Sequence, residues 1–270
     1  MIMSNFLMSK RDIAWIWEIS LKFMYAVKYV KSLDGFLKEN NVRRLLDCSC
    51  GVGFPAIGLK KLGYDIVCSD ADEKMLRRFR HNCVMEGVRI EAKRLRWQQL
   101  SNAFGQEFDC VLCRGNSLPY VVSWVGENVD VRNALPEIEK SIQGMFRVLK
   151  PGGLLYVDAS PREAFTPKQT VIEENFGCRK DNSKTIEMVW RIRHDLVNHT
   201  REWSPEIIIK SKGSNLVEKA RADFKGYHLT HSELLQAMEK AGFRGIEKYR
   251  EIEGEKNYDV FIGHKWSSWI

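Results

Sequence analysis

The sequence has no long hydrophobic run. None of its 270 residues belongs to a stretch approaching the roughly 18 consecutive apolar residues that a membrane-spanning helix needs. The first residues, 1–8, also lack the basic start and the long apolar segment of a secretory signal peptide. We therefore expect a cytoplasmic protein that does not interact with a membrane.

The cysteines and histidines show no recognisable catalytic or metal-binding motif. Cys110 and Cys113 have the spacing of metal ligands, but they lie in a predicted strand, where residues three apart point to opposite faces. We therefore expect no metal site. The six histidines are scattered, so no catalytic base can be identified among them. Five of the seven cysteines lie in or beside apolar strand candidates, which indicates buried thiols in a reducing compartment: Cys48, Cys50, Cys68, Cys110 and Cys113.

The composition is that of an ordinary globular protein, with 44% hydrophobic and 29% charged residues. The length suffices for one large α/β domain with an insertion. The net charge of +7 has two interpretations, solubility or a preference for anionic partners, and we favour solubility. A basic stripe on the predicted helix 72–86 is likewise interpreted as a solvated face, with nucleic-acid contact as the alternative; it comprises Lys74, Arg77, Arg78 and His81.

A nucleoside-binding unit is predicted over residues 43–70. An apolar segment ending at Asp47 is followed by a glycine loop, a helix and a second apolar segment that ends at Asp70. Gly51 and Gly53 allow a tight turn and a close approach of the backbone to a ligand. Asp70 follows the first of these glycines at the distance where a carboxylate typically binds a ribose diol.

Two cofactors are compatible with this loop. Gly51, Gly53 and Ala56 satisfy the dinucleotide pattern, which by itself indicates NAD. Asp47 argues against NAD, because a carboxylate beside the loop would repel a pyrophosphate, whereas it suits the ammonium and sulfonium groups of S-adenosylmethionine. Its alternative role is that of a loop or cap residue. Residues 149–157 resemble the turn and fifth strand of class I methyltransferases, so we predict S-adenosylmethionine.

The other elements follow from periodicity. A helix over 12–32 has apolar residues widely around its surface, which indicates a helix folded over a site. A short helix at 33–41 precedes the first strand. Further helices are predicted at 72–86, 134–149 and 230–241, and further strands at 89–95, 108–113, 245–252 and 257–264.

The segment 160–228 is too long for an ordinary connection. Residues 185–195 alternate between apolar and polar, residues 200–210 form a second extended run, and a turn sequence lies between them. We predict an antiparallel meander that caps a substrate pocket. The alternative is a decorative or oligomerising sheet.

Four stretches, with the Pro-Gly-Gly turn at 151–153, carry a resemblance to a known family: 46–53, 69–76, 96–97 and 108–120. The chain resembles the glycine/sarcosine N-methyltransferase group within the class I S-adenosylmethionine-dependent methyltransferases. The resemblance covers about 43–160 and fades beyond Pro161. It implies an α/β fold with a Rossmann-like, seven-stranded, mostly parallel sheet that ends in an antiparallel hairpin, plus the antiparallel cap insertion. The implied regions are an N-terminal helical lid (1–42), the cofactor-binding core (43–160), the cap (161–228) and a C-terminal part that completes the core (229–270).

The resemblance also implies cofactor contacts. The backbone at Ser49 and Gly51 would lie along the methionyl part, Asp70 would accept hydrogen bonds from the ribose hydroxyls, and Trp97 would meet the adenine. Trp97 could instead be a core aromatic. The full implied cofactor set is Tyr25, Asp47, Ser49, Gly51, Gly53, Asp70, Ala71, Arg96, Trp97, Cys113 and Arg114.

On the acceptor side, the resemblance implies that Asn116 points its amide oxygen at the substrate amine, although Asn is also a common turn residue. Tyr120 would hydrogen-bond the nucleophile or pack on it. The family's substrate-carboxylate arginine aligns with Ser160, and the nearest candidate is Arg162. We therefore hypothesise a small amine with an anionic group bound by Arg162, whose alternative role is that of a surface loop residue.

A second departure from the family concerns the cofactor carboxylate. The amino-terminal arginine that binds it in the family aligns with Tyr25 here, and Lys22 is a possible substitute.

The predicted reaction is direct in-line transfer of a methyl group to nitrogen. Two alternatives are methylation of RNA or protein and methylation of an oxygen in a small metabolite. The loop reads Asn-Ser-Leu-Pro-Tyr at 116–120, which is not the Asn/Asp-Pro-Pro-Tyr/Phe of base-amine enzymes, so a nucleic-acid partner is disfavoured. A third alternative is an NAD-binding protein. The sequence leaves the acceptor and the oligomeric state open.

Overall fold

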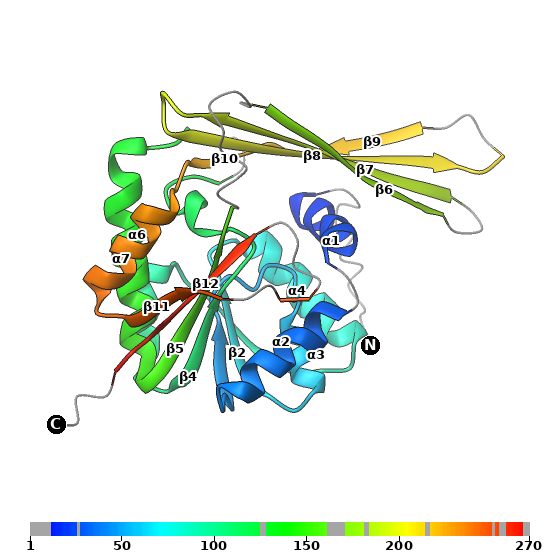
Figure 1. Ribbon diagram of the computed structural model, residues 1–270. Helices are drawn as coiled ribbons and strands as arrows, with labels where there is room; N and C mark the ends of the chain where they lie inside the picture. The colour runs from blue at the N-terminus through cyan, green and yellow to red at the C-terminus, as the bar shows by residue number, and fades with distance from the viewer. Residues whose placement is uncertain are drawn as a thin grey trace.

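The protein contains two β-sheets, one seven-stranded and one five-stranded (Figure 1). The computed structural model describes residues 12–25, 28–124, 128–160, 171–180, 184–213, 217–249, 252–253 and 258–266, with only the backbone and Cys178 described in 171–180. In Figure 1 the five-stranded sheet lies above the carboxyl ends of the seven-stranded one.

The seven-stranded sheet has the order β11-β12-β5-β4-β1-β2-β3. Strands β1 to β5 pair in parallel, whereas β12 pairs antiparallel with β5 and β11 antiparallel with β12. The predicted fold class is therefore confirmed. The strand bounds are β1 (Arg44–Asp47), β2 (Asp65–Asp70), β3 (Glu91–Arg94), β4 (Phe108–Cys113), β5 (Leu149–Ala159), β11 (Arg244–Lys248) and β12 (Asp259–His264).

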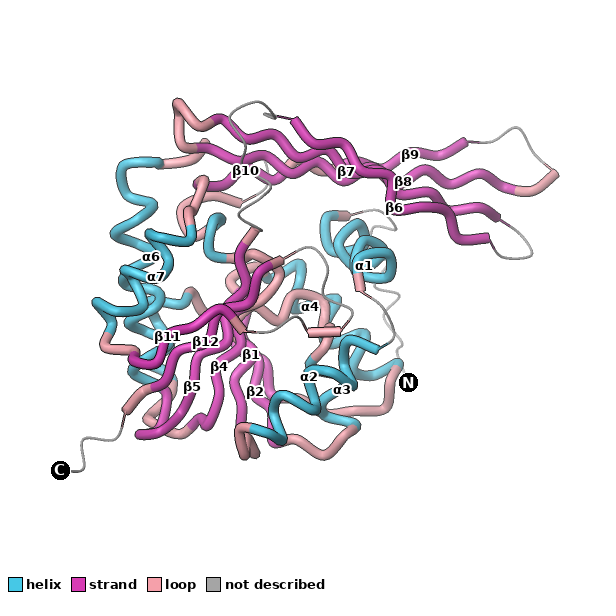
Figure 2. Tube along the Cα trace, in the orientation of Figure 1, coloured by secondary structure: helices cyan, strands magenta, loops and turns pink. Residues whose placement is uncertain are grey.

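Helices cover both faces of this sheet, as Figure 2 shows. Because side chains alternate along a strand, Leu45 of β1 packs in one core and its neighbour Leu46 in the other. The first core includes residues of α2 (Lys28–Glu39), α3 (Ala56–Lys61) and α4 (Glu73–Met85). The second includes residues of α5 (Leu100–Ala103), α6 (Val131–Val148) and α7 (His231–Ala241). Strands buried on both faces have the near-continuous apolar sequences that this chain shows.

The ends of α4 and α7 follow the sequence signals. The side chain of Asp72 accepts the backbone N–H of Lys74 and caps α4. Thr230 and Glu233 form a capping box at the start of α7, and Gly242 ends that helix at φ 103°, a left-handed conformation that favours glycine. The helices predicted at 72–86 and 230–241 are confirmed.

The helical prediction at the N-terminus was wrong in its boundaries. In place of one helix over 12–32 and a second from 33, the structure has α1 (Ile13–Met24) and α2, which begins at Lys28. Tyr25 is extended, with φ −108° and ψ 131°, and its ring packs on Phe54 at a centroid distance of 5.0 Å. This tertiary contact fixes the end of α1 where the sequence has neither Gly nor Pro to mark it.

The five-stranded sheet contains the predicted meander. The strands β7 (Lys184–Asp195) and β8 (Thr200–Ser211) pair antiparallel, as expected. Sequence analysis missed the other three strands: β6 (Val171–Lys180), β9 (Val217–Arg221) and β10 (Phe224–Tyr227). On the side toward α1, this sheet buries Met188, Trp190, Trp203, Ile207 and Phe224 in the first core.

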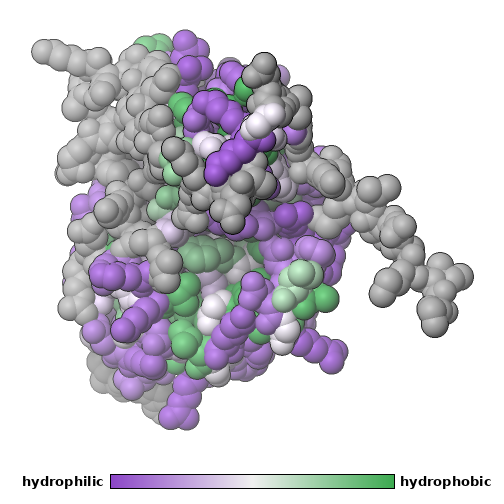
Figure 3. Space-filling model, turned by 90° about the vertical axis from the view of Figure 1, so that its right-hand side faces the viewer, coloured by the Kyte–Doolittle hydropathy of each residue, from purple (hydrophilic) through white to green (hydrophobic). Residues whose placement is uncertain are grey.

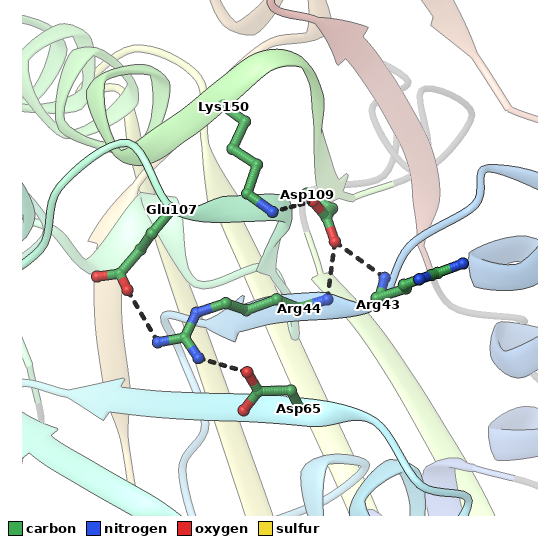
Figure 4. A network of polar contacts seen from close by, with 6 residues as sticks. All are labelled: Arg43, Arg44, Asp65, Glu107, Asp109 and Lys150. Carbon is green, nitrogen blue, oxygen red and sulfur yellow. Dashed lines mark hydrogen bonds and ion pairs between the residues drawn. The ribbon is translucent and has the colours of Figure 1, made fainter.

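A network of ion pairs lies at the amino edge of the parallel strands (Figure 4). Arg44 pairs with Asp65 of β2 and, at 2.8 Å, with Glu107 beside β4. Asp109 accepts the backbone N–H of Arg44 at 2.8 Å and pairs with Lys150 at 2.6 Å. The side chains of five residues in this network therefore each have a partner of opposite charge: Arg44, Asp65, Glu107, Asp109 and Lys150.

The surface is mixed in polarity. On the face shown in Figure 3, a group of apolar side chains lies among hydrophilic ones. None of the described helices has both the length and the hydropathy to cross a bilayer. The described residues also contain no cluster of three or more His, Cys, Asp or Glu that could hold a metal ion.

Candidate active site

A cavity of about 530 Å³ lies at the carboxyl ends of β1, β2 and β4. The strand order reverses between β1 and β4, and ligands of open α/β sheets bind at such a switch point. Helices α1 and α4, strand β8 and the loop 120–124 contribute further parts of the wall. Of the residues predicted from the sequence, these line the cavity: Ser49, Gly51, Asp70, Ala71, Arg96, Trp97 and Tyr120.

The glycine loop is shaped by close packing. Gly51 has φ +49°, and a Cβ there would lie 3.0 Å from Nε1 of Trp17, which lines the cavity from α1. A Cβ at Gly53 (φ +109°) would lie 2.7 Å from Cδ1 of Ile57. Glu18 of α1 forms an ion pair with Arg78 of α4, which holds the helix over the loop.

Asp70 stands at the end of β2 and faces the cavity. Its Oδ2 accepts the backbone N–H of Gly51 at 2.9 Å, and its Oδ1 accepts that of Asp72 at 2.9 Å. Burial raises the pKa of this carboxyl to about 6, against the effect of these hydrogen bonds. At neutral pH it is ionised, and each oxygen keeps a further lone pair for a ligand hydroxyl.

Asp47, at the end of β1, is buried and does not line the cavity. Oδ1 accepts the backbone N–H of Ser49 at 3.2 Å, whereas Oδ2 has no hydrogen-bond partner. Burial raises the pKa of Asp47 to about 7, although the nearby Arg114 lowers it. A cationic group brought close to this carboxyl would favour its ionised form.

Trp97 and Arg96 line the cavity beyond β3. Nε1 of Trp97 donates to the carbonyl of Cys48 at 2.7 Å, so the ring is fixed in orientation. A Cβ at Gly144 of α6 would lie 2.4 Å from the carbonyl oxygen of Trp97, so this packing requires glycine. The ring is thus a rigid flat surface in the cavity wall.

Arg114 and Tyr25 pack together outside the cavity lining. The Arg114 side chain is 5% exposed, its Nε donates to the hydroxyl of Tyr29 at 2.6 Å, and its guanidinium lies 5.3 Å from the ring centroid of Tyr25. The guanidinium Nη2 is buried without a hydrogen-bond partner. Two further residues of the predicted cofactor set, Gly53 and Cys113, are also absent from the cavity lining.

Asn116 belongs to a tightly held loop. Oδ1 of Asp158 accepts its backbone N–H at 2.6 Å, and Oδ2 accepts that of Gly115 at 2.8 Å. Its side-chain amide donates to Oγ of Ser160 at 2.8 Å, and the residue is 2% exposed. Asn116 does not line the cavity, whereas Tyr120 of η2 (Leu118–Tyr120) does.

Sequence analysis did not identify the residues of the five-stranded sheet that line the cavity. Arg201 and Trp203 of β8 line the cavity, and so do Trp17 and Trp124. The signal was present in the predicted strand 200–210, because Arg201 occupies the same face as the apolar Trp203. The predicted Arg162 lies outside the described residues.

Two buried histidines lie beside this wall. Nδ1 of His194 is 3.3 Å from Nδ1 of His228. Burial, together with the charge of Arg201, lowers the pKa of His194 to about 3 and also lowers the pKa of His228. Both imidazoles are therefore neutral at physiological pH.

Comparison with known proteins identifies the core. Residues 46–157 match the methyltransferase domain family. This part of the chain therefore has the sequence of a methyltransferase domain. Over 148 residues the chain is 30% identical to a glycine/sarcosine N-methyltransferase of Parasynechococcus marenigrum, covering 54% of this chain and 49% of that protein. Over 142 residues it is 32% identical to glycine N-methyltransferase of Oryctolagus cuniculus, covering 48% and 45%.

The chain thus spans about half the length of these curated relatives. A solved structure with the same fold is that of CalS10 with S-adenosylmethionine bound, an amino pentose methyltransferase from Micromonospora echinaspora. It superposes with a TM-score of 0.68 at 16% identity, over 93% of this chain and 96% of that one.

The residues of the methyltransferase domain fit its cofactor. The ionised Asp70 offers free lone pairs to a ribose diol, and Trp97 offers a fixed aromatic face to an adenine. Close by lies the unpartnered Oδ2 of Asp47, whose charge suits a cationic ligand better than a pyrophosphate. The dinucleotide reading of the glycine loop is disfavoured by this carboxyl.

Proposed function

We propose that the protein transfers a methyl group from S-adenosylmethionine to the nitrogen of a small amine. The observation that carries the proposal is the Asp70 carboxylate, which faces the cavity at the switch point of the sheet. The similarity to two curated N-methyltransferases supports nitrogen as the acceptor atom. Trp17 of α1 and Trp203 of β8 add walls to the cavity beside the strand ends, which supports a small acceptor over RNA or protein.

The cofactor supplies an electrophilic methyl group, so the protein has to align and desolvate the amine. Asp70, Trp97 and the loop at Ser49–Gly51 would hold the cofactor, with Asp47 favouring its positive charge. Alignment can account for roughly 7–11 kcal/mol of barrier lowering. Asp158 keeps the Gly115–Asn116 loop in place through two backbone hydrogen bonds.

Tyr120 is suited to orient the acceptor. Burial raises the pKa of its hydroxyl, so the group stays protonated at neutral pH. The hydroxyl accepts a hydrogen bond from Nη1 of Arg201 at 2.7 Å, which leaves its own proton free for an acceptor in the cavity. This hydroxyl can therefore hold the acceptor molecule by a hydrogen bond, without forming a covalent bond to it.

The test is a methyl-transfer assay with isotopically labelled S-adenosylmethionine. The acceptors are a panel of amino acids and other small amines, with transfer RNA and total protein as macromolecular competitors. We expect labelled, N-methylated small molecules, identified by mass spectrometry. Label found only in RNA or protein, or only on oxygen, would contradict the proposal.

A further inference from the structure

Arg201 is a buried cation that has no counter-ion among the described residues. It is 6% exposed, its Nε has no hydrogen-bond partner, and it lines the cavity. Arg221 on the adjacent strand β9, by contrast, pairs with Asp223 at 2.7 Å. Within the described part of the chain no carboxylate pairs with Arg201. An uncompensated buried charge is costly, which points to a ligand that supplies the missing anion.

The two residues that lie opposite Arg201 in the sheet carry no charge. In the sheet it lies opposite His194 and Gly226. His194 and His228 are uncharged, as derived above from their lowered pKa values. A Cβ at Gly226 would lie 2.9 Å from Cδ1 of Tyr120, so glycine there lets the tyrosine ring pack against β10. The tyrosine hydroxyl thereby reaches Arg201, and both groups offer N–H or O–H donors to the same space.

Three tryptophans form the rest of this part of the cavity. We call Trp17, Trp124 and Trp203 the aromatic wall. Trp17 meets Trp203 edge to face at 5.3 Å, and both Trp124 and Trp203 pack on Phe224, at 4.8 and 4.7 Å. The wall is therefore held rigid by ring contacts, and its surface is suited to an apolar or planar group.

We propose that Arg201 and the hydroxyl of Tyr120 bind a carboxylate of the methyl acceptor, while the aromatic wall receives an apolar ring or chain of the same molecule. The inference rests on the proposed function and narrows its substrate class. A guanidinium matches a carboxylate in bidentate geometry. Glycine has the carboxylate but nothing to fill the wall, so the acceptor is a larger amino carboxylate.

The experiment uses ligands without an amine, so that binding is separated from methyl transfer. The protein is saturated with S-adenosylhomocysteine and titrated, in a calorimeter, with phenylacetate, phenylacetamide and acetate. We expect phenylacetate to bind, and phenylacetamide to bind about 10- to 100-fold more weakly because it lacks the charge. Acetate should bind at least about tenfold more weakly because it leaves the aromatic wall unfilled.

Variants of Arg201 test whether this residue is responsible for the affinity for phenylacetate. Arg201→Met should lower the affinity for phenylacetate to that for phenylacetamide, and Arg201→Lys should give an intermediate value. The matched control is Arg193→Met, which removes an exposed arginine from the neighbouring strand β7 and should change nothing. The affinity for S-adenosylhomocysteine should be the same in all variants, which also verifies that they fold.

Equal binding of phenylacetate and phenylacetamide to the unmodified protein would overturn the inference, as would absence of phenylacetate binding. Unchanged phenylacetate affinity in folded Arg201→Met would do the same. Methylation of neutral amines without phenylacetate binding would refute only the anion site. Phenylacetate binding without methyl transfer to any amine would refute only the proposed function.

Discussion

Charged residues are paired differently at the two ends of the parallel strands, which we call the amino edge and the carboxyl edge of the seven-stranded sheet. At the amino edge, Arg44 and Asp109 have partners of opposite charge at short distances. Beyond the carboxyl ends, Asp47 of β1 and Arg201 of the five-stranded sheet are buried, and neither forms an ion pair with another described residue. A buried charge without an ion-pair partner destabilises a fold, so these two residues mark the carboxyl ends as the side of the sheet that binds ligands. The amino edge is built for stability and the carboxyl edge for binding.

The largest effect is expected at Asp158, which satisfies two backbone N–H groups at the carboxyl edge. Asp158→Ala leaves both donors buried without an acceptor, and we expect the free energy of unfolding to fall by about 2–5 kcal/mol. Methyl transfer should be lost as well, because the Gly115–Asn116 loop is released. Chemical denaturation measures the first effect. Asp158→Asn retains one acceptor oxygen and should lose less; equal stability of all three proteins would contradict the assignment.

Replacement of Asp47 should raise the free energy of unfolding, in contrast to replacement of Asp158. Burial raises its pKa to about 7, above the ordinary value of 3.8, so the folded state holds its proton more tightly than the unfolded state. Its contribution to stability is therefore greatest below pH 3.8 and is lost as the pH rises toward 7. Asp47→Asn should stabilise the cofactor-free protein at pH 7 by on the order of 2–4 kcal/mol and weaken S-adenosylmethionine binding.

Denaturation of both proteins between pH 4 and pH 7 checks this account of Asp47, with the interval taken from the ordinary and raised pKa values. The stability difference should shrink toward the lower pH. A variant that is less stable than the unmodified protein at pH 7 would mean that the carboxylate is satisfied in the cofactor-free fold.

At the amino edge, removal of a charge should destabilise. Asp109 accepts the backbone N–H groups of Arg43 and Arg44 and pairs with Lys150; these hydrogen bonds hold its pKa below the ordinary value, although burial opposes them. Asp109→Ala should lower the free energy of unfolding by about 1–3 kcal/mol at pH 7. The loss should disappear as the pH falls below the folded-state pKa of Asp109. An effect that persists in acid would mean that packing, and not charge, is responsible.

The smallest effect is expected for the exposed pair of Arg44 and Glu107, whose side chains are 33% and 37% exposed. Glu107→Ala should change the free energy of unfolding by less than about 1 kcal/mol. It should leave cofactor affinity untouched, which calorimetry can verify. A change in cofactor affinity would contradict the conclusion that the amino edge contributes to stability and not to ligand binding.

The sequence predicted what depends on short-range patterns. The glycine loop, the two strand-end carboxyls and the capped helix from Thr230 to Ala241 are each specified by residues close together in the chain. The end of α1 at Tyr25 was missed because it depends on a contact with Phe54, far along the sequence.

The acceptor side was less predictable for the same reason. Arg201 reaches the cavity only because β8 folds back over the core, and its hydrogen-bond partner Tyr120 lies 81 residues earlier in the chain. The resemblance to known methyltransferases fades before this segment, so it pointed to Arg162 instead. The alternation along β8 could have identified Arg201, because it places this arginine on the same face of the strand as the apolar Trp203.

The most direct test of the account is calorimetry of cofactor binding to the unmodified protein and to Asp70→Ala. Asp70 faces the cavity as an ionised carboxylate, held by the backbone of Gly51 and Asp72. We predict that S-adenosylmethionine binds, that NAD does not, and that Asp70→Ala weakens binding of S-adenosylmethionine by about 1.5–3 kcal/mol. Binding of NAD alone, or an unchanged S-adenosylmethionine affinity in a folded Asp70→Ala protein, would contradict the account.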